Sequence, residues 1–236
     1  MQGGVNPPFL NLGNLMFYRS TSYIFLLEVK MMINKSYKHW MIVFLMCCLA
    51  ASSIGLCTNA IGVFYTPVSK SLHVLKGTFA MHATLSTLIT ALTSLKMSKL
   101  IRKYNYKKIL LIGVLLSSVS TWMMSYSRSV YLFYILGILR GIGVGIGGMV
   151  PITVIITNWF DEKHGLATGL ALSFSGLAGA IFSPLLSSWI TCYGWQMTYR
   201  LMAICIFILV FPVLIVPWKI NPQEENLLPY GYQERK

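Results

Sequence analysis

Acidic residues are scarce in this chain. It carries six Asp and Glu against nineteen Lys and Arg among 236 residues, which gives a net charge of +13. Charged residues make up 11% of the chain, whereas a soluble domain carries roughly 25%, and the mean hydropathy is +0.66. This composition excludes an ordinary soluble domain and predicts an all-α membrane protein in a lipid bilayer. No acid lies in a long apolar run; the six are Glu28, Asp161, Glu162, Glu224, Glu225 and Glu234.

Metal, nucleotide and catalytic chemistry have no support in the sequence. The cysteines lack metal-ligand spacing and are odd in number, so they indicate neither a zinc site nor a disulfide framework. The glycine-rich stretch 137–147 lies inside an apolar run, which excludes a phosphate-binding loop between a strand and a helix. No Ser/His/Asp set is available without acids in the apolar runs. We expect no enzyme activity, no cofactor and no metal. The five cysteines are Cys47, Cys48, Cys57, Cys192 and Cys205.

Charge-free runs predict six transmembrane helices, because about 20 apolar residues cross the hydrocarbon core of a bilayer. The run from His164 to Tyr199 has 36 residues without Asp, Glu, Lys or Arg and is too long for one helix. Its segment 192–195 combines a glycine with interfacial aromatic residues, so we divide the run there. The spans are expected near residues 40–65, 78–95, 109–126, 131–157, 165–190 and 197–218.

The domain organisation follows from these spans. We expect an N-terminal cytoplasmic extension over residues 1–38, a six-helix bundle over residues 39–218, and a cytoplasmic segment over residues 219–236. The first of these has no complete apolar span and no signal-peptide pattern. Met31 and Met32, followed by Lys35 and Lys38, offer an alternative start just before the first helix.

Basic residues predict the orientation, since cytoplasmic loops carry an excess of Lys and Arg. The loops on one side hold only Lys70, Lys76 and Arg128, whereas the terminal segments and the other loops hold the rest outside the helices. Both termini are therefore expected in the cytoplasm of a multi-pass cell-membrane protein. The excess positive charge is explained by this topology and by anionic lipid headgroups, not by nucleic acid.

Arg140 is the most informative single residue. The eleven residues before it (Ser129 to Leu139) and the twenty after it (Gly141 to Phe160) are uncharged. An ionisable residue at membrane depth is a functional candidate, and no acid of the apolar runs is available to neutralise this one. Arg140 therefore awaits either an anion or an acid from another polypeptide segment. His82, in the second span, is a candidate for proton coupling, or is simply wet near the extracellular end.

Glycines recur at helical spacing in two spans. Gly137, Gly141 and Gly145 lie four residues apart, and Gly165 and Gly169 repeat the spacing in the next span. Small residues at this spacing let neighbouring helix backbones approach closely. We therefore interpret these glycines as helix-packing positions.

Four segments together resemble the N-terminal six-helix half of a major facilitator superfamily transporter, and most closely the oxalate/formate antiporter and monocarboxylate-transporter-like group. They are Gly62 to Pro67 at the exit of the first span, the basic segment Ser98 to Lys108, Arg140 to Gly145, and His164 to Gly169 with the later landmarks Ser175-Gly176, Pro184 and Gly194-Trp195. The segment Pro222 to Gly231 is similar to the start of the family's central cytoplasmic loop. The likeness covers residues 36–231.

The resemblance implies a fold and a function. Two inverted three-helix repeats would form half of a twelve-helix transporter, and the substrate would bind between the halves. The first and fourth helices of the family line that cavity, so a small organic anion such as a monocarboxylate would meet Arg140. Ser52, Thr58 and Asn59 on the first helix, with Tyr134, would complete the hydrogen bonds. The first three are equally able to bond their own helix backbone. The gating loop would use Lys99, Arg102, Lys107 and Lys108.

The chain also departs from the family pattern. Ser98, Arg102 and Asn105 stand where the basic loop usually has glycine, aspartate and glycine, so the acidic partner of the loop is missing. The sequence ends at the central loop, so its cavity face, with Arg140, is expected to face lipid unless a second six-helix half or a homodimer partner covers it. The alternatives to a transporter half are a membrane protein that acts only through helix contacts and an inactive remnant.

Overall fold

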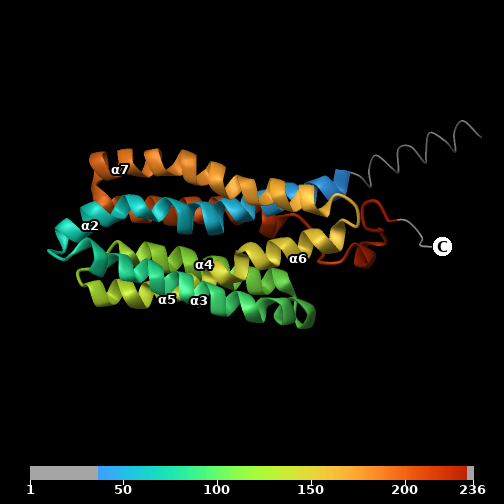
Figure 1. The fold of residues 1–236 in the computed structure, drawn as a ribbon, viewed down its shortest axis with the longest axis horizontal. Coiled ribbons are helices and arrows are strands. Elements are labelled where there is room, and N and C mark those ends of the chain that lie inside the picture. The colour runs from blue at the N-terminus through green and yellow to red at the C-terminus, as the bar shows by residue number, and fades with distance from the viewer. Residues whose placement is uncertain (1–36, 233–236) are drawn as a thin grey trace, which may run out of the picture. The chain divides into compact units, whose positions relative to one another are not determined.

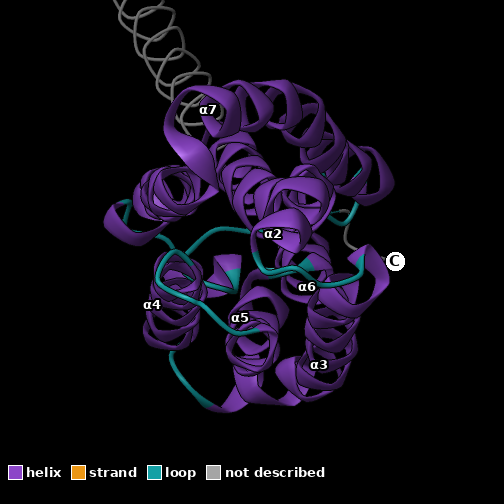
Figure 2. Ribbon diagram, turned by 90° about the vertical axis from the view of Figure 1, so that its left-hand side faces the viewer, coloured by secondary structure: helices purple, strands orange, loops and turns teal. Residues whose placement is uncertain are grey.

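The computed structural model describes residues 37–232, without the Arg102 side chain. The expected N-terminal extension, with its alternative start, lies almost wholly outside the described residues. The helices from Met41 onward belong to one compact unit, Met41–Lys236. Among the described residues the secondary structure is helical, apart from one bridge between Phe160 and Tyr230 (Figures 1 and 2). After the helix over residues 37–50 come η1 (Ala51–Asn59), η2 (Ala60–Phe64), α2 (Tyr65–Ser71), α3 (Lys76–Lys103), α4 (Tyr106–Met124), α5 (Val130–Gly147), α6 (Met149–Trp159), α7 (His164–Ile215) and η3 (Pro222–Glu225).

The first helical span is continuous from Tyr37 to Ser71 but irregular at its centre. There η1 is wound as a π-helix and η2 as a 3₁₀-helix. At Gly55 the chain lies so close to α7 that an added Cβ would come within 2.6 Å of the Ala178 Cβ. π-Helical turns are rare and are often found at functional sites. This one holds all the polar residues of the first helix that the sequence assigned to a substrate site.

Glycines let α5 pack between α3 and α4. A Cβ at Gly137 would come within 2.7 Å of the His82 carbonyl oxygen of α3, and one at Gly145 within 2.6 Å of the Thr93 Cβ. On the other flank, a Cβ at Gly143 would come within 2.8 Å of the Ser117 nitrogen of α4. Two faces of α5 therefore bring neighbouring backbones close together, as small residues do in membrane helix pairs.

The long helix α7 consists of two arms that meet at Gly194. This residue has φ 80° and ψ 162°, a conformation that glycine adopts most readily, and the helical geometry is interrupted there. The break falls in the segment where the sequence predicts a turn. The first span packs against both arms: the Ser52 Oγ donates to the Ile206 carbonyl at 3.1 Å, and the Asn59 Nδ2 donates to the Ser175 carbonyl at 3.1 Å.

Two hydrophobic cores lie at opposite ends of the helices. One combines the start of the first span with the α3–α4 connection, α6 and the residues after α7, including Met46, Tyr106, Trp159 and Trp218. The other surrounds the end of the first span, the start of α3, and the Gly194 turn. The first residues from Met41 onward and η3 lie at the same end of the helices (Figure 1). In Figure 1 the first span and α2 lie between the first arm of α7 and the group α3, α4 and α5, whereas the second arm of α7 packs directly against α4.

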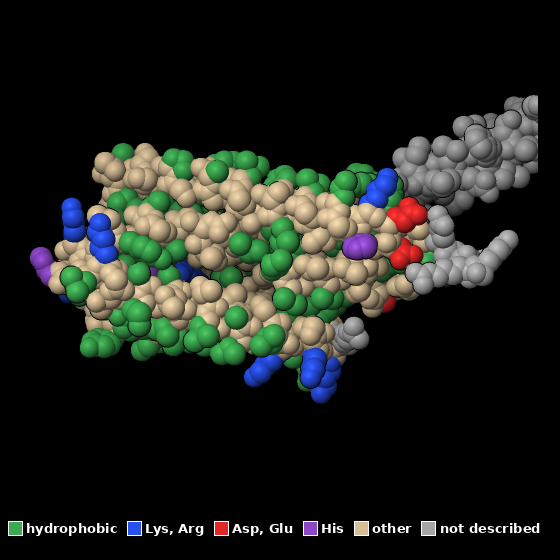
Figure 3. All heavy atoms as spheres, in the orientation of Figure 1, with side chains coloured by type: hydrophobic (Ala, Val, Ile, Leu, Met, Phe, Trp, Pro, Cys, Tyr) green, Lys and Arg blue, Asp and Glu red, His purple; other side chains and the backbone are tan. Residues whose placement is uncertain are grey.

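The lateral surface is apolar. On the face drawn in Figure 3, charged side chains gather at the two ends of the helices and hydrophobic ones lie between them. Four described helical segments are long and apolar enough to cross a membrane: Tyr37–Ser71, Tyr106–Met124, Val130–Trp159 and His164–Ile215. Six crossings and inverted repeats remain predictions, because α3 is not among these segments and α7 is counted once. Exposed apolar residues of the lateral surface include Leu88, Leu92, Ile112, Val119, Ile135, Leu177, Ile208 and Phe211.

Candidate functional site

Arg140 lies deep among the helices of its own chain. Its side chain is only 1% exposed. The Nη1 atom makes one long contact to the Met124 Sδ at 4.0 Å, and the Nε atom has no hydrogen-bond partner. The expectation that Arg140 faces lipid in the absence of a second half is therefore wrong. The reason is that residues of the first span, α3 and α7 enclose α5 at this level, which a linear sequence does not reveal.

Several ring-bearing residues lie close enough to Arg140 to interact with it electrostatically, among them Tyr65, His82 and Tyr199. We use the term aromatic cluster for seven ring-bearing residues whose rings contact one another. Within it, the Phe64 and Tyr199 rings stack with centroids 4.0 Å apart, and the Phe79 and His82 rings lie 4.4 Å apart. Rings of this kind exclude water from a buried charge and strengthen its electrostatic interactions. The aromatic cluster is Phe64, Tyr65, Phe79, His82, Phe133, Trp195 and Tyr199.

Three buried polar atoms in this region have no hydrogen-bond partner. Among the described residues they are the His82 Nε2, the Arg140 Nε and the Tyr199 hydroxyl. The guanidinium is close enough to His82 and Tyr199 to interact electrostatically with both. An unsatisfied buried donor or acceptor costs about 1–3 kcal/mol, so native structures contain few of them. Three in one region make this the candidate site of the described residues.

His82 is fully buried, so the interpretation of this residue as wet is wrong. Its ring lies against Phe79 and Phe133, and its Nδ1 lies 2.6 Å from the Phe79 carbonyl oxygen. A carbonyl oxygen only accepts, so the Nδ1 carries the hydrogen of this bond. The role of His82 in proton coupling remains a prediction.

The polar residues of the first helix are mostly occupied by contacts between helices. The Ser52 hydroxyl donates to a backbone carbonyl of α7. The Ser53 Oγ lies 2.7 Å from both the Leu49 carbonyl of its own helix and the Gly147 carbonyl of α5. Thr58 and Asn59 are exposed, and the Asn59 amide reaches α7. Of these groups, Thr58 and Asn59 are the ones placed where a second polypeptide or a substrate has access.

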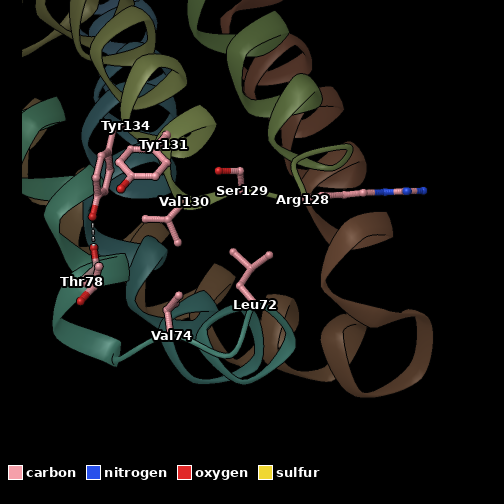
Figure 4. Close-up of a pocket in the computed structure, with 8 residues that line it drawn as sticks. All are labelled: Leu72, Val74, Thr78, Arg128, Ser129, Val130, Tyr131 and Tyr134. Atoms are coloured by element: carbon pink, nitrogen blue, oxygen red, sulfur yellow. Dashed lines mark hydrogen bonds between the residues drawn. The ribbon is translucent and has the colours of Figure 1, made fainter.

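Tyr134 lies near the N-terminal end of α5, beside the α4–α5 loop. Its hydroxyl donates to the Thr78 carbonyl at 2.7 Å. Figure 4 shows this bond and the Arg128 side chain directed away from it. Tyr134 borders a hollow of about 340 Å³ that is also lined by Leu72, Val74, Thr78, Arg128, Ser129, Val130 and Tyr131. A second hollow of about 330 Å³ shares Arg128 and Leu72.

The basic segment is helical for most of its length. Helix α3 extends to Lys103, and Asn105 caps α4 by accepting from the Lys107 backbone nitrogen at 3.1 Å. The Lys107 Nζ donates to the Val216 carbonyl at the end of α7, at 2.6 Å, and lies over the Trp218 ring. In a segment without an acid, Lys107 thus joins α4 to the end of α7. Lys99 and Lys108 are exposed, and the Arg102 side chain lies outside the described part of the structure.

The glycines of α7 differ from those of α5. Gly165 and Gly169 are exposed, and a Cβ added at either would meet no described atom within 4 Å. Their role in packing therefore remains a prediction that requires a second polypeptide.

Tyr199 is a residue of this region that the sequence did not predict. It lies at the end of the long charge-free run, one helical turn after Trp195, and its hydroxyl lacks a partner. Aromatic residues four positions apart on one helix face were the available signal.

Helices long and apolar enough to cross a membrane, with an apolar lateral surface, are those of an integral membrane protein. The family model of the Major Facilitator Superfamily matches residues 47–234. The chain belongs to this superfamily and is related to its monocarboxylate transporters.

Three relatives illustrate the similarity. The uncharacterised transporter YcxA of Bacillus subtilis is 24% identical over 71% of this chain and 41% of its own. Human monocarboxylate transporter 14 is 27% identical over 58% of this chain and 27% of its own. The probable sulfoacetate transporter SauU of Cupriavidus necator is 32% identical over 40% of this chain and 22% of its own. The chain thus matches less than half the length of each relative.

Proposed function

We propose that this chain forms one half of a transporter that moves a small organic anion, such as a monocarboxylate, across a cell membrane by alternating access. The observation that carries the proposal is the buried Arg140 guanidinium, which has an unsatisfied Nε and no acid in its own apolar spans. Human monocarboxylate transporter 14 and the probable sulfoacetate transporter SauU are both named for organic anions, which supports an organic anion as the class of substrate.

The chemistry of the guanidinium fits this role. Its planar fork matches the two oxygens of a carboxylate, and such charge-assisted pairs are stronger than neutral hydrogen bonds. A buried cation without a partner is destabilising, so an arriving anion removes an energetic penalty as the helices close around it. Occupancy and closure are thereby coupled, as alternating access requires.

A second six-helix half is part of the proposal. The relatives are more than twice as long as the matched region. The exposed glycines of α7, with exposed Thr58 and Asn59, provide a surface where helices of a second polypeptide approach closely. That half is either a separate polypeptide or a second copy of this chain.

The rival explanation for Arg140 is a fixed salt bridge with an acid from the second half. It predicts a protein whose guanidinium is permanently neutralised in the assembly and which binds no anion there. A membrane protein that acts through helix contacts alone, or an inactive remnant, would likewise show no anion flux.

The test is anion uptake into proteoliposomes that contain the full chain, with lactate and sulfoacetate as labelled probes. We expect uptake of at least one probe, and loss of that uptake in Arg140→Ala. Arg128→Ala is the matched control, because this arginine is exposed in the α4–α5 loop. Flux that survives Arg140→Ala unchanged would refute the role of Arg140. Absence of flux from a stably inserted wild-type protein would exclude a transporter made of two copies of this chain, and would favour either a separate second half or the interaction role.

A further inference from the structure

The end of α3 and the start of α4 carry a group of exposed lysines, which we call the basic turn. Residues 29–160 contain no Asp or Glu, so neither helix supplies an acid to neutralise them. The described acids lie instead in the α6–α7 connection and in η3. Figure 3 shows basic side chains that project from the surface at the end of α3, apart from the acidic ones. The basic turn is Lys96, Lys99, Lys103 and Lys108.

The basic turn also has the aromatic character of a membrane interface. Tyr104, which connects the two helices, is 54% exposed, and the Lys103 Nζ lies 5.4 Å from the centroid of its ring. Tyrosine is enriched at the level of lipid headgroups, and a lysine there extends its apolar stem along the surface while its ammonium reaches polar groups. The predicted orientation places this end at the cytoplasmic leaflet, where anionic lipids create a negative surface potential.

An exposed apolar face of α4 continues from the basic turn. Ile112, Leu115 and Val119 follow Lys108 at intervals of four, three and four residues, so all four lie on one helix face. The three apolar side chains are 62%, 44% and 53% exposed. Helix from Lys108 to Val119 extends about 16 Å, close to half of the roughly 30 Å hydrocarbon core. A cation followed by one leaflet of aliphatic surface matches the layout of a phospholipid.

This face of α4 fits lipid better than a second polypeptide. Small residues let membrane helices pack closely, and the exposed glycines Gly165 and Gly169 belong to the first arm of α7. The exposed face of α4 instead carries branched aliphatic side chains, and less than half of this candidate membrane span is buried by its own chain. Such a face gains nothing by leaving lipid, because the acyl chains are equally apolar.

We propose that the basic turn and the exposed face of α4 bind one anionic phospholipid of the membrane. The phosphate is held by the ammonium groups of Lys103 and Lys108, and an acyl chain lies along the three apolar residues of α4. Lys107 does not take part, because its Nζ donates to the Val216 carbonyl. The lipid phosphate supplies the negative charge that this segment lacks. The site is separate from Arg140 and requires no substrate.

The test measures lipid binding to the full chain by native mass spectrometry in a neutral detergent. The probes are phosphatidylglycerol, which is anionic, and phosphatidylcholine with the same acyl chains, which is zwitterionic. One basic residue near an anionic surface contributes about 1 kcal/mol, or roughly fivefold in affinity. For two lysines we therefore expect phosphatidylglycerol to bind about 25-fold more tightly. Glycerol phosphate, which lacks acyl chains, should not displace it at equal concentration.

Variants then assign the preference to residues. The double variant Lys103→Gln with Lys108→Gln should bind phosphatidylglycerol no more tightly than phosphatidylcholine, whose affinity stays unchanged. The matched control is Lys70→Gln with Lys76→Gln, which removes the same charge from exposed lysines at the other end of the helices and should keep the preference. Ile112→Ser should weaken both lipids by a similar factor, because it alters the apolar face and leaves both lysines in place.

Four results would overturn the proposal. Equal affinities of the wild type for the two lipids would exclude a headgroup site, and this comparison does not depend on whether any variant folds. Equal losses in the two double variants would show that net charge alone attracts the lipid. Displacement by glycerol phosphate would assign the basic turn to a free phosphate. A dimer that is lost in Lys103→Gln with Lys108→Gln would assign it to a second copy of this chain. None of these results touches the proposed role of Arg140.

Discussion

Replacing Arg140 by methionine should stabilise the protein while it removes anion binding. Methionine is unbranched and adapts to irregular apolar sites, and it would lie among the same rings and the Met124 thioether. The arginine, by contrast, keeps a charge and an unsatisfied Nε in a position that is 1% exposed. The substitution therefore removes a penalty and breaks no ion pair within the described residues.

The magnitude follows from two contributions. An unsatisfied buried donor costs about 1–3 kcal/mol, and a buried ion retains a penalty of several kcal/mol after relaxation. The volume mismatch offsets part of this gain, by up to about 1.5 kcal/mol. We expect Arg140→Met to raise the free energy of unfolding by about 2 kcal/mol. For a chain of this size that corresponds to a rise of about 6 °C in the unfolding midpoint.

Thermal unfolding of the detergent-solubilised chain, with and without the anion probe that it transports, is the assay. A ligand at 100 times its Kd stabilises the wild type by about 2.7 kcal/mol and should leave Arg140→Met unaffected. Arg200→Met is the matched control, because the Arg200 Nε donates to the Ser125 Oγ at 3.2 Å and its guanidinium lies over the Tyr126 ring. That variant should be neutral or destabilised. A lower midpoint for Arg140→Met in the absence of ligand would refute the reasoning.

Two further predictions concern packing. Gly137→Ala should destabilise the chain by about 1–3 kcal/mol, because the new Cβ would lie 2.7 Å from a backbone carbonyl of α3. Gly169→Ala, where the new Cβ meets no described atom, should instead stabilise the chain by about 1 kcal/mol through helix propensity. Chemical unfolding of both variants measures the two changes in the free energy of unfolding. Equal changes would contradict the close packing of Gly137 against α3. Lys107→Met should destabilise the chain by about 1–2 kcal/mol through loss of the bond to Val216, and should hasten proteolysis after α7. Exposed Lys99→Met is its control, and identical cleavage rates would count against the bond.

Much of the fold was predictable because it depends on local rules. Charge-free runs mark helices, and Gly194 interrupts α7 inside the segment where a turn was expected. The π-helical centre of the first span was not predictable, because it depends on the close approach of Gly55 to α7. The extension of α3 to Lys103 was also missed, since basic residues were interpreted as loop although they are good helix formers.

The candidate site was predictable only in part. Arg140 was identified because a charged residue inside an apolar run can be recognised from the sequence alone. The residues around it come from three other segments, and the sequence does not show that these segments lie close to it. Whether a hydroxyl is free depends on which carbonyl lies opposite it: Ser52 and Tyr134 were plausible ligands, and both donate to carbonyls of neighbouring helices. Tyr199 was not predicted as a site residue, although its hydroxyl is one of the buried polar groups without a hydrogen-bond partner.

The two glycine series also show that sequence spacing alone does not determine which helices are in contact. The spacing of Gly137, Gly141 and Gly145 matches that of Gly165 and Gly169, so the sequence predicts the same packing role for both series. In the structure the first series brings α3 close to α5, whereas the second meets no described atom. The proposed function assigns these two features to separate requirements, a second polypeptide for α7 and an anion for Arg140. If one acid from a second half met both, adding that half would abolish anion binding; if the requirements are separate, it would tighten it.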